Sequence, residues 1–332
     1  MAEPRPRVWL ARPLFEDITG RLDQHFEVVR SAVEDRYASD EIAARLRDVD
    51  GALVTLVERI GAAEIAGAAR LRAVANVGVG HDNLDIAALG AAGVLVTNTP
   101  DVLTDTTADF GFALLMAAAR RLGEAERWLR AGHWGRWSFD TLLGADLHGS
   151  TLGILGMGRI GQGIARRGAG FGMPVLYHNR HRLPQSVERG CRAQYVTFEA
   201  LLQRSDHLVL TLPHSPATHH LIDAAALARM KPAATLVNIA RGGIVDETAL
   251  VAALAGGRLG AAGLDVYEGE PAVRPELLAL DNVVLTPHIA SASLATRRAM
   301  VALAVDNLVA ALGRGPDAGR PPTPVDPDAL KR

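Results

Sequence analysis

Short apolar segments alternate with amphipathic segments along most of the chain. The apolar segments are rich in β-branched residues, which is typical of buried strands. We expect strands at Arg7–Ala11, Glu27–Val29, Ala52–Leu56, Arg72–Val77, Val94–Thr97, Thr151–Leu155, Pro174–His178, Leu208–Leu212, Thr235–Ile239, Ala262–Val266 and Val283–Thr286. Helical spacing predicts helices at Asp17–His25, Asp40–Asp48, Ala62–Ala69, Leu84–Ala91, Phe198–Gln203, Ala224–Met230, Glu247–Ala255 and Leu294–Leu312. This alternation predicts an α/β fold with doubly wound parallel sheets.

The alternation breaks once, at Asn98–Asp105, before a long apolar helix predicted at Thr106–Arg121. Its apolar stripe is wide enough to be buried on more than one side. The helix could pack only on its own sheet, or it could lie between two subunits. The tryptophan-rich segment His133–Trp137 follows it, and tryptophan is enriched at interfaces, so a homodimer is one expectation.

Composition narrows the class of protein. The chain has 332 residues, 48% of them hydrophobic, so two domains are expected. The formal net charge of −2 indicates neither a nucleic-acid nor a membrane partner. No segment resembles a secretory signal or spans a bilayer, and the one cysteine, Cys191, favours a cytoplasmic location.

A glycine-rich loop lies between the predicted strand Thr151–Leu155 and the helix after it. Gly156, Gly158 and Gly161 form a G-x-G-x-x-G motif. The first glycine permits a tight turn, the second lets the backbone approach a pyrophosphate, and the third allows close helix packing. Because a second strand returns within about thirty residues, the motif predicts a dinucleotide-binding βαβ unit.

The end of that second strand predicts the kind of dinucleotide. A carboxylate is typical there in proteins that bind the ribose 2′-hydroxyl of NAD. This chain has Asn179, followed by the basic residues Arg180, His181 and Arg182. Basic side chains at this position can pair with a 2′-phosphate, so we expect NADPH (NADP) as cofactor, with NADH possible but less preferred.

Three further candidates follow predicted strands. Arg241, Glu270 and His288 lie at the carboxyl ends of three strands, and in a parallel sheet these ends share the edge where ligands bind. A histidine can deliver a proton to a carbonyl oxygen, a neighbouring carboxylate favours its charged form, and an arginine fork suits the carboxylate of a 2-oxoacid. Each of the three side chains could instead be structural. Their shared place at the sheet edge beside the dinucleotide motif, however, indicates hydride-transfer chemistry.

Four histidines also cluster in the sequence: His207, His214, His219 and His220. No carboxylate pattern accompanies them. We therefore expect packing or solvated residues and no metal site.

The chain resembles the D-isomer-specific 2-hydroxyacid dehydrogenases, most closely the glyoxylate/hydroxypyruvate reductases and 2-ketogluconate reductases. The resemblance covers nearly the whole chain and is carried by VGVGHDNLD, TPDVLTDTTAD, LGILGMGRIGQGIA, NIARGGIVDETAL, AAGLDVYEGEP and TPHIASAS. It implies two Rossmann-like domains with a cleft between them. Residues 1–99 and 291–332 would form the substrate-binding domain, and residues 100–290 the NAD(P)-binding domain.

The resemblance also implies residue roles. His288 would be the acid/base, Glu270 its partner, and Arg241 the ligand of the substrate, a small 2-oxoacid, helped by backbone N–H groups of Val77 and Gly78. The cofactor contacts it implies are Thr106, Gly158, Arg159, Ile160, Arg180 to Arg182, Pro213, Ile239, Ala240, Arg241, His288 and Asp265, the last holding the nicotinamide amide. A homodimer is implied, with Trp137 a candidate to reach the partner's site.

The expected function is therefore an NADPH-preferring reductase of glyoxylate, hydroxypyruvate or 2-ketogluconate that forms the D-2-hydroxyacid. Two alternatives stay open. One is a phosphoglycerate-type NAD-dependent dehydrogenase, and the other is a non-catalytic, dinucleotide-sensing protein like the corepressors that share this fold.

Overall fold

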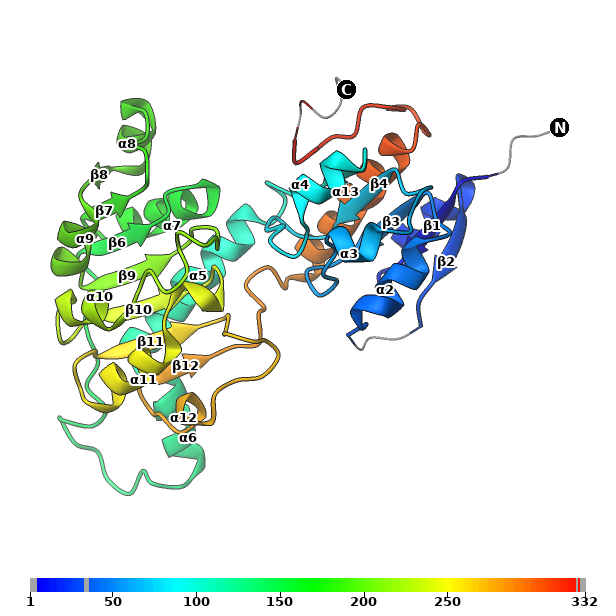
Figure 1. Ribbon diagram of the computed structural model, residues 1–332. Helices are drawn as coiled ribbons and strands as arrows, with labels where there is room; N and C mark the ends of the chain where they lie inside the picture. The colour runs from blue at the N-terminus through cyan, green and yellow to red at the C-terminus, as the bar shows by residue number, and fades with distance from the viewer. Residues whose placement is uncertain (1–4, 33–35, 327, 329–332) are drawn as a thin grey trace. The chain divides into compact units, whose positions relative to one another are not determined.

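The structure is a computed structural model that describes residues 5–32, 36–326 and 328 (Figure 1). Contacts divide the chain into two compact units, one of Met1–Leu103 with Ser293–Arg332 and the other of Thr104–Ala292. Each unit is built on one parallel sheet. The expected division into a substrate domain and a cofactor domain stays a prediction about function.

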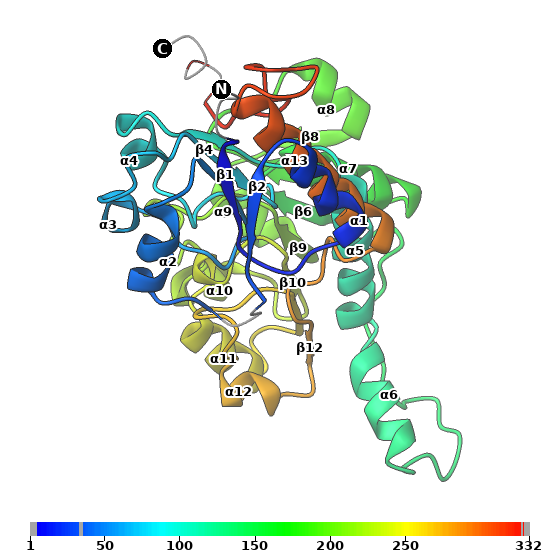
Figure 2. The same ribbon diagram turned by 90° about the vertical axis from the view of Figure 1, so that its right-hand side faces the viewer.

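The first unit has a five-stranded parallel sheet in the order β2-β1-β3-β4-β5. The strands are β1 Arg7–Leu10, β2 Glu27–Arg30, β3 Gly51–Val54, β4 Ala73–Asn76 and β5 Leu95–Thr97. Its helices are α1 Glu16–Thr19, a 3₁₀ turn Gly20–Gln24, α2 Ser39–Leu46, α3 Ala62–Ile65, α4 Ile86–Ala91 and α13 Leu294–Ala311. Figure 2 shows α2, α3 and α4 on one side of the strands and α1 and α13 on the other. The central strands β3 and β4 are therefore buried on both faces, as their small and apolar residues predict.

The second unit has a seven-stranded parallel sheet in the order β12-β11-β10-β9-β6-β7-β8. The strands are β6 Leu152–Leu155, β7 Val175–His178, β8 Ala193–Tyr195, β9 His207–Leu210, β10 Thr235–Asn238, β11 Ala261–Leu264 and β12 Val283–Leu285. The helices are α5 Thr104–Ala119, α6 Leu122–Arg130, α7 Arg159–Gly170, α8 Gln185–Cys191, α9 Phe198–Arg204, α10 Ala224–Arg229, a 3₁₀ turn Gly242–Ile244, α11 Glu247–Ala255 and α12 Pro275–Leu278.

Two apolar cores cover the two faces of this second sheet. One core joins the sheet to α9, α10, α11 and α12, and the other joins it to α5, α7 and α8. The strand order reverses beside β6, because β7 pairs with one edge of β6 and β9 with the other. Such a reversal opens a crevice at the carboxyl ends of the strands, which is where dinucleotides bind in doubly wound sheets. The fold class expected from the sequence is confirmed.

Some element boundaries differ from the prediction. The long apolar helix ends at Ala119, and α6 begins only after Arg121, whose φ of 55° is left-handed. Beyond α13, the described part of the tail contacts the first sheet, because the amide of Val325 donates to the carbonyl of Val96 in β5. Among the residues that the structure describes, no helix is both long and apolar enough to cross a bilayer.

Candidate active site

The glycine-rich loop has the conformation that a pyrophosphate site needs. Gly156 has a φ of 100°, and a Cβ there would lie 2.6 Å from the amide nitrogen of Leu212. A Cβ at Gly161 would lie 2.5 Å from the carbonyl oxygen of Gly156. These two positions accept only glycine, since a side chain would collide with backbone atoms.

Gly158 is different, because nothing lies within 4 Å of the position that its Cβ would take. It is the exposed N-cap of α7, and Arg159, Ile160 and Gly161 form the first turn of that helix. First-turn N–H groups have no partner within their helix and carry its positive end, so they attract an anion. The open space and the helix end together fit the diphosphate of a dinucleotide.

The basic cluster after β7 divides into two parts. Asn179 turns back to the glycine loop, where its Oδ1 accepts a hydrogen bond of 2.6 Å from the amide of Met157. Arg182 makes a two-pronged ion pair with Glu188, with both N–O distances 2.8 Å. Arg182 and Tyr177 together lower the pKa of Glu188 to about 2. Arg180 and His181 are exposed and remain the stronger candidates for contact with a 2′-phosphate.

The other expected cofactor residues lie at neighbouring strand ends of the same sheet or in α5. Pro213 is exposed after β9, Ile239 and Ala240 are buried after β10, and Thr106 is half-buried in the first turn of α5. Their roles toward a cofactor stay predictions.

His288 and Glu270 are in direct contact. His288 follows β12 with a left-handed φ of 54°, and its Nδ1 lies 2.8 Å from Oε2 of Glu270. The other carboxylate oxygen of Glu270 accepts a hydrogen bond of 2.9 Å from the amide of Tyr267. Burial raises the pKa of Glu270, but the hydrogen bond and charge of His288 outweigh it, and the pKa lies below its usual value. Because Nδ1 faces the carboxylate, Nε2 is the nitrogen that can serve a substrate.

Arg241 is held at the end of β10 by a buried asparagine. Asn238 accepts from the amide of Ala240 at 3.0 Å and donates to the carbonyl of Arg241 at 2.8 Å. The guanidinium donates through Nη1 to the carbonyl of Ala240, and its charge is one of those that lower the pKa of Glu270. Sequence reasoning missed Asn238, although its place at the end of a buried strand was a signal.

The loops that carry Arg241 and Glu270 are in backbone contact. A Cβ on Gly242 would lie 1.9 Å from the carbonyl carbon of Tyr267, so only glycine allows this approach. The hydroxyl of Tyr267 also donates to the carbonyl of Thr286 at 2.9 Å, which ties the same loop to the one that carries His288. The three expected catalytic side chains therefore lie on loops that pack against one another within the second unit.

The sequence did not predict the hydrogen bonds that Asp265 makes to the loop of His288. Its buried carboxylate accepts from Oγ1 of Thr286 at 2.7 Å and from the amides of Ile289 and Ala290 at 2.8 Å each. Its backbone carbonyl accepts from the amide of His288 at 2.9 Å. Burial raises the pKa of Asp265, against the effect of these hydrogen bonds. Asp265 thus fixes the loop around His288, whereas a contact with the nicotinamide amide stays a prediction.

The two expected substrate contacts in the first unit follow β4. The amide of Val77 donates to the carbonyl of Val54 at 2.8 Å, and the amide of Gly78 donates to the carbonyl of Asn76 at 3.0 Å. The role of both residues toward a substrate stays a prediction.

The structure corrects the expectation that no carboxylate accompanies the four histidines. His207 is buried as expected, with its Nε2 3.1 Å from the carbonyl of Asp146. His220, however, is hydrogen-bonded to the carboxylate of Glu268, His219 stacks on His220, and His214 contacts His219. The sequence did not show this pairing, since the two residues are 48 positions apart.

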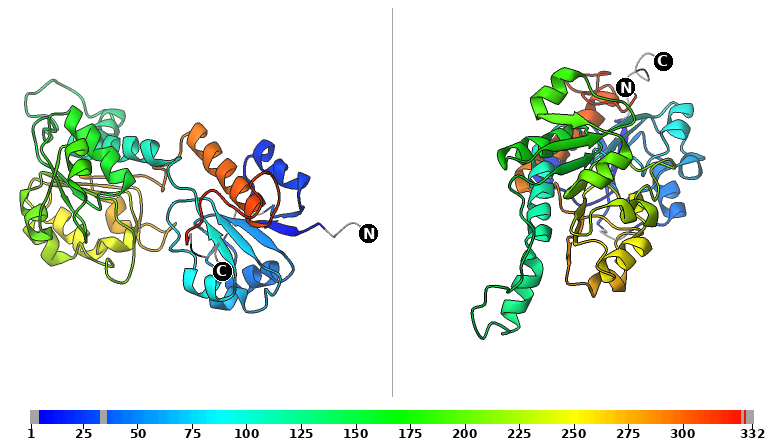
Figure 3. Two further views of the ribbon diagram at one scale, coloured as in Figure 1. Left: turned by 90° about the horizontal axis from the view of Figure 1, so that it is seen from above. Right: turned by 90° about the vertical axis from the view of Figure 1, so that its left-hand side faces the viewer.

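The segment after α5 carries a set of exposed apolar side chains. Figures 2 and 3 show α6 and the segment that follows it extending away from the sheet of the second unit. The exposed residues are Leu122, Leu129, Trp134, Trp137, Phe139 and Leu143, and Phe139 is 87% exposed. We call the residues 122–146 the arm.

Comparisons with known proteins find relatives that match nearly the whole chain. The chain is 46% identical over 310 residues to a glyoxylate reductase of Thermococcus onnurineus, covering 92% of each chain. It is 44% identical over 310 residues to a glyoxylate/hydroxypyruvate reductase B of Klebsiella pneumoniae, covering 93% of this chain and 95% of that one.

One solved structure is also similar to this chain over nearly its whole length. It is that of an NADPH-dependent glyoxylate/hydroxypyruvate reductase of Sinorhizobium meliloti in complex with NADP and malonate, with 39% identity, a TM-score of 0.85 and 97% of each chain covered. The sequence model of the D-isomer specific 2-hydroxyacid dehydrogenase NAD binding domain matches residues 112–290. That range contains the glycine loop and the three residues Arg241, Glu270 and His288, and the chain belongs to the D-isomer-specific 2-hydroxyacid dehydrogenase family of oxidoreductases.

Proposed function

We propose that the protein is an NADPH-preferring reductase of glyoxylate and hydroxypyruvate, with 2-ketogluconate as a further candidate substrate, and that it forms the D-2-hydroxyacid. The observation that carries the proposal is the 2.8 Å contact between His288 and Glu270 beside the loop of Arg241. The names of the relatives favour neither a phosphoglycerate-type dehydrogenase nor a corepressor-like protein.

The three side chains supply what the reduction of a 2-oxoacid requires. A bound nicotinamide dinucleotide supplies the hydride, which goes to the carbonyl carbon. His288 gives a proton from Nε2 to the carbonyl oxygen, while its Nδ1 stays paired with Glu270. Arg241 binds the substrate carboxylate through its planar fork and holds the carbonyl in place. Hydride and proton together convert the aldehyde or ketone carbonyl into a hydroxyl, so the reaction balances.

The preference for NADPH rests on the end of β7. Asn179 offers no negative charge there, and its Oδ1 is occupied by the glycine loop. Arg180 and His181 are exposed beside it and can bind a 2′-phosphate. The Sinorhizobium relative, named NADPH-dependent, was crystallised with NADP and supports the assignment.

The arm supports a homodimer. A stretch that exposes two tryptophans, a phenylalanine and three leucines is typical of a surface that a partner covers. We assign it to a second copy of the chain, and Trp137 is the candidate to reach the partner's site. Sedimentation of the purified protein would test this, because Trp137→Ala together with Phe139→Ala should weaken the dimer.

A substrate panel tests the activity. Purified protein is mixed with NADPH or NADH and with glyoxylate, hydroxypyruvate, 2-ketogluconate or 3-phosphohydroxypyruvate, and loss of the reduced cofactor's absorbance is followed. We expect the highest kcat/KM with NADPH and one of the first two acids. Preference for the phosphorylated acid would favour the phosphoglycerate-type alternative, and no turnover with any acid would favour a corepressor-like protein.

Arg180→Glu tests the cofactor assignment. Its matched control is Arg189→Glu, an exposed arginine on α8. We expect Arg180→Glu to raise the KM for NADPH by at least about tenfold, as loss of one charged hydrogen bond implies. The KM for NADH should stay nearly unchanged. Equal KM values for NADPH in the two variants would refute a contact between Arg180 and the 2′-phosphate.

A further inference from the structure

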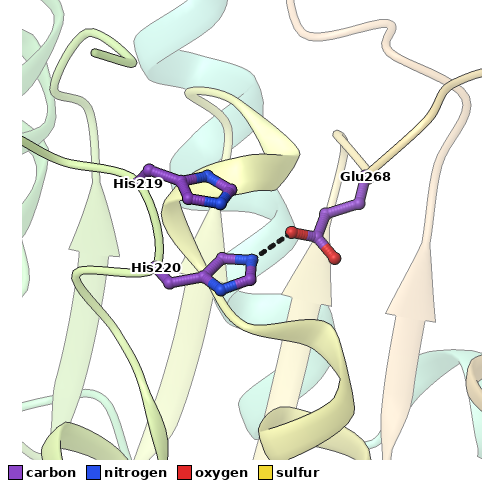
Figure 4. A group of neighbouring side chains, drawn as sticks. All are labelled: His219, His220 and Glu268. Carbon is purple, nitrogen blue, oxygen red and sulfur yellow. Dashed lines mark hydrogen bonds and ion pairs between the residues drawn. The ribbon is translucent and has the colours of Figure 1, made fainter. Parts of the chain in front are cut away.

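Two histidines and a glutamate meet outside the site described above (Figure 4). His219 and His220 lie in the segment between β9 and α10, and Glu268 lies just beyond β11. Nε2 of His220 is hydrogen-bonded to Oε1 of Glu268. The ring of His219 stacks on that of His220, with centroids 4.0 Å apart and an angle of 22° between the planes. One nitrogen or oxygen from each of the three residues lies within 4.8 Å of the others.

A third histidine orients the first. Nε2 of His214 lies 3.3 Å from Nδ1 of His219. With Nδ1 facing His214, Nε2 is the nitrogen of His219 that can bind a ligand. Metal-binding histidines usually have such a second partner, which fixes the ring and its tautomer.

The backbone around the cluster leaves room for these rings. A Cβ on Gly243 would lie 2.9 Å from Nε2 of His214 and 3.3 Å from Nδ1 of His219, so a larger residue would press on both. His220 has a left-handed φ of 50°, and its amide donates to the carbonyl of Gly243 at 2.8 Å. The loop is thus held in a conformation that directs two neighbouring histidine rings toward Glu268.

Two further carboxylates lie near Glu268. The amide of Glu268 donates to Oε1 of the buried Glu247 at 2.6 Å, and Glu270 is two residues further on. Arg274, with Nε 3.7 Å from Oε2 of Glu247, offsets part of this charge. A cation beside Glu268 would reduce the remaining repulsion.

We propose that His219, His220 and Glu268 form a binding site for a divalent transition-metal ion of the zinc type. Two imidazole nitrogens and one carboxylate oxygen are a donor set that Zn²⁺ accepts, with water in the fourth position. The ion takes the place of the hydrogen bond between His220 and Glu268, and small movements of the three side chains, whose ligand atoms already lie within 4.8 Å of one another, bring them to the ion. The ion ties the segment before α10 to the loop that carries Glu270. It stands apart from His288 and takes no part in hydride transfer.

Metal titration of the full chain, purified without a histidine tag and treated with chelator, tests the site. Calorimetry with ZnCl₂ should show about one bound ion per chain, and CoCl₂ should give the visible absorption of cobalt bound to nitrogen and oxygen ligands. Zn²⁺ should also raise the melting temperature, because a ligand that binds only the folded state stabilises it.

Three variants and one control locate the ion. His219→Ala and Glu268→Gln should each abolish the cobalt spectrum and weaken Zn²⁺ binding by more than about tenfold, and His214→Ala should weaken it by about tenfold. The control His148→Ala removes an exposed histidine of the second unit that lies outside the arm, and it should leave Zn²⁺ binding and the cobalt spectrum unchanged.

His219 is exposed, so its variant should fold even if Glu268→Gln does not. The proposal is overturned if the wild-type protein binds no Zn²⁺ saturably, or if His219→Ala binds it as the wild type does. A melting temperature of the metal-free variant equal to that of the metal-free wild type shows that any loss of binding is local.

Discussion

Glu270→Gln is the most direct test of the proposed acid/base pair. Glutamine keeps the size of the side chain and can still accept a hydrogen bond from Nδ1 of His288, but it carries no charge. Both partners are about two-thirds buried, with side-chain exposures of 33% for His288 and 30% for Glu270. The substitution therefore removes a charge from a short contact that water screens only in part.

The expected magnitude follows from the strength of such a contact. A hydrogen bond to a charged group contributes about 1.5 to 3 kcal/mol, and a hydrogen bond between neutral groups about 0.5 to 1.5 kcal/mol, so the exchange costs about 1 to 1.5 kcal/mol. At about 1.4 kcal/mol per factor of ten, this cost lowers kcat for reduction about 5- to 12-fold. The KM for the 2-oxoacid should change little, since Arg241 binds the carboxylate.

Steady-state rates from pH 5 to 10, with saturating NADPH and varied glyoxylate, measure both effects. Glu276→Gln is a matched control, because it makes the same exchange at an exposed position in α12 of the same unit. Glu270 has a lowered pKa in the folded protein, so its contribution to stability is complete above the pKa of the unfolded chain and is lost only as the pH falls through the folded value. A kcat of Glu270→Gln equal to that of the control would refute the assignment.

Three further substitutions test the supporting structure. Gly242→Ala places a Cβ 1.9 Å from the Tyr267 carbonyl carbon, so it should cost about 3 kcal/mol or more and lower the melting temperature by roughly 6 to 12 °C, as measured by calorimetry. Gly158→Ala meets no atom within 4 Å, so the melting temperature should stay unchanged while the Kd for NADPH rises about tenfold in fluorescence titration. Glu188→Gln breaks the pair with Arg182 and should lower the melting temperature at neutral pH. Because the pKa of Glu188 is lowered from 4.5 to about 2, the difference from wild type should shrink as the pH falls from about 6 toward 3.

The sheets could be predicted because their strands are buried on both faces. β6, β9 and β10 are fully buried, and each contains two or more consecutive apolar residues. β8, Ala193–Tyr195, was missed because it is a three-residue edge strand with one exposed and two half-buried residues. The end of α5 was predicted to within two residues, at Arg121 instead of Ala119, but the left-handed backbone of Arg121 was not predicted.

For the candidate site, the sequence predicted which edge of the sheet each residue lies at, but not which side chains touch. A residue that follows a parallel strand must lie at one known edge of the sheet, and this rule selected Arg241, Glu270 and His288. This rule does not predict which side chains on different loops contact one another. The pairs Arg182–Glu188 and His220–Glu268, and the anchoring of the His288 loop by Asp265, depend on loop conformations that no sequence pattern encodes.

The loop Tyr267–Glu270 links the proposed metal site to the proposed catalytic pair. Glu268 pairs with His220 and Glu270 pairs with His288, and both histidines have left-handed backbones. The backbone of Tyr267 and Glu268 also packs directly on Gly242. A shift of this loop that pulls Glu268 toward an ion must therefore also move Glu270 relative to His288. The reductase activity of the metal-bound protein should accordingly differ from that of the metal-free protein in pH dependence, even though the ion touches no reacting atom.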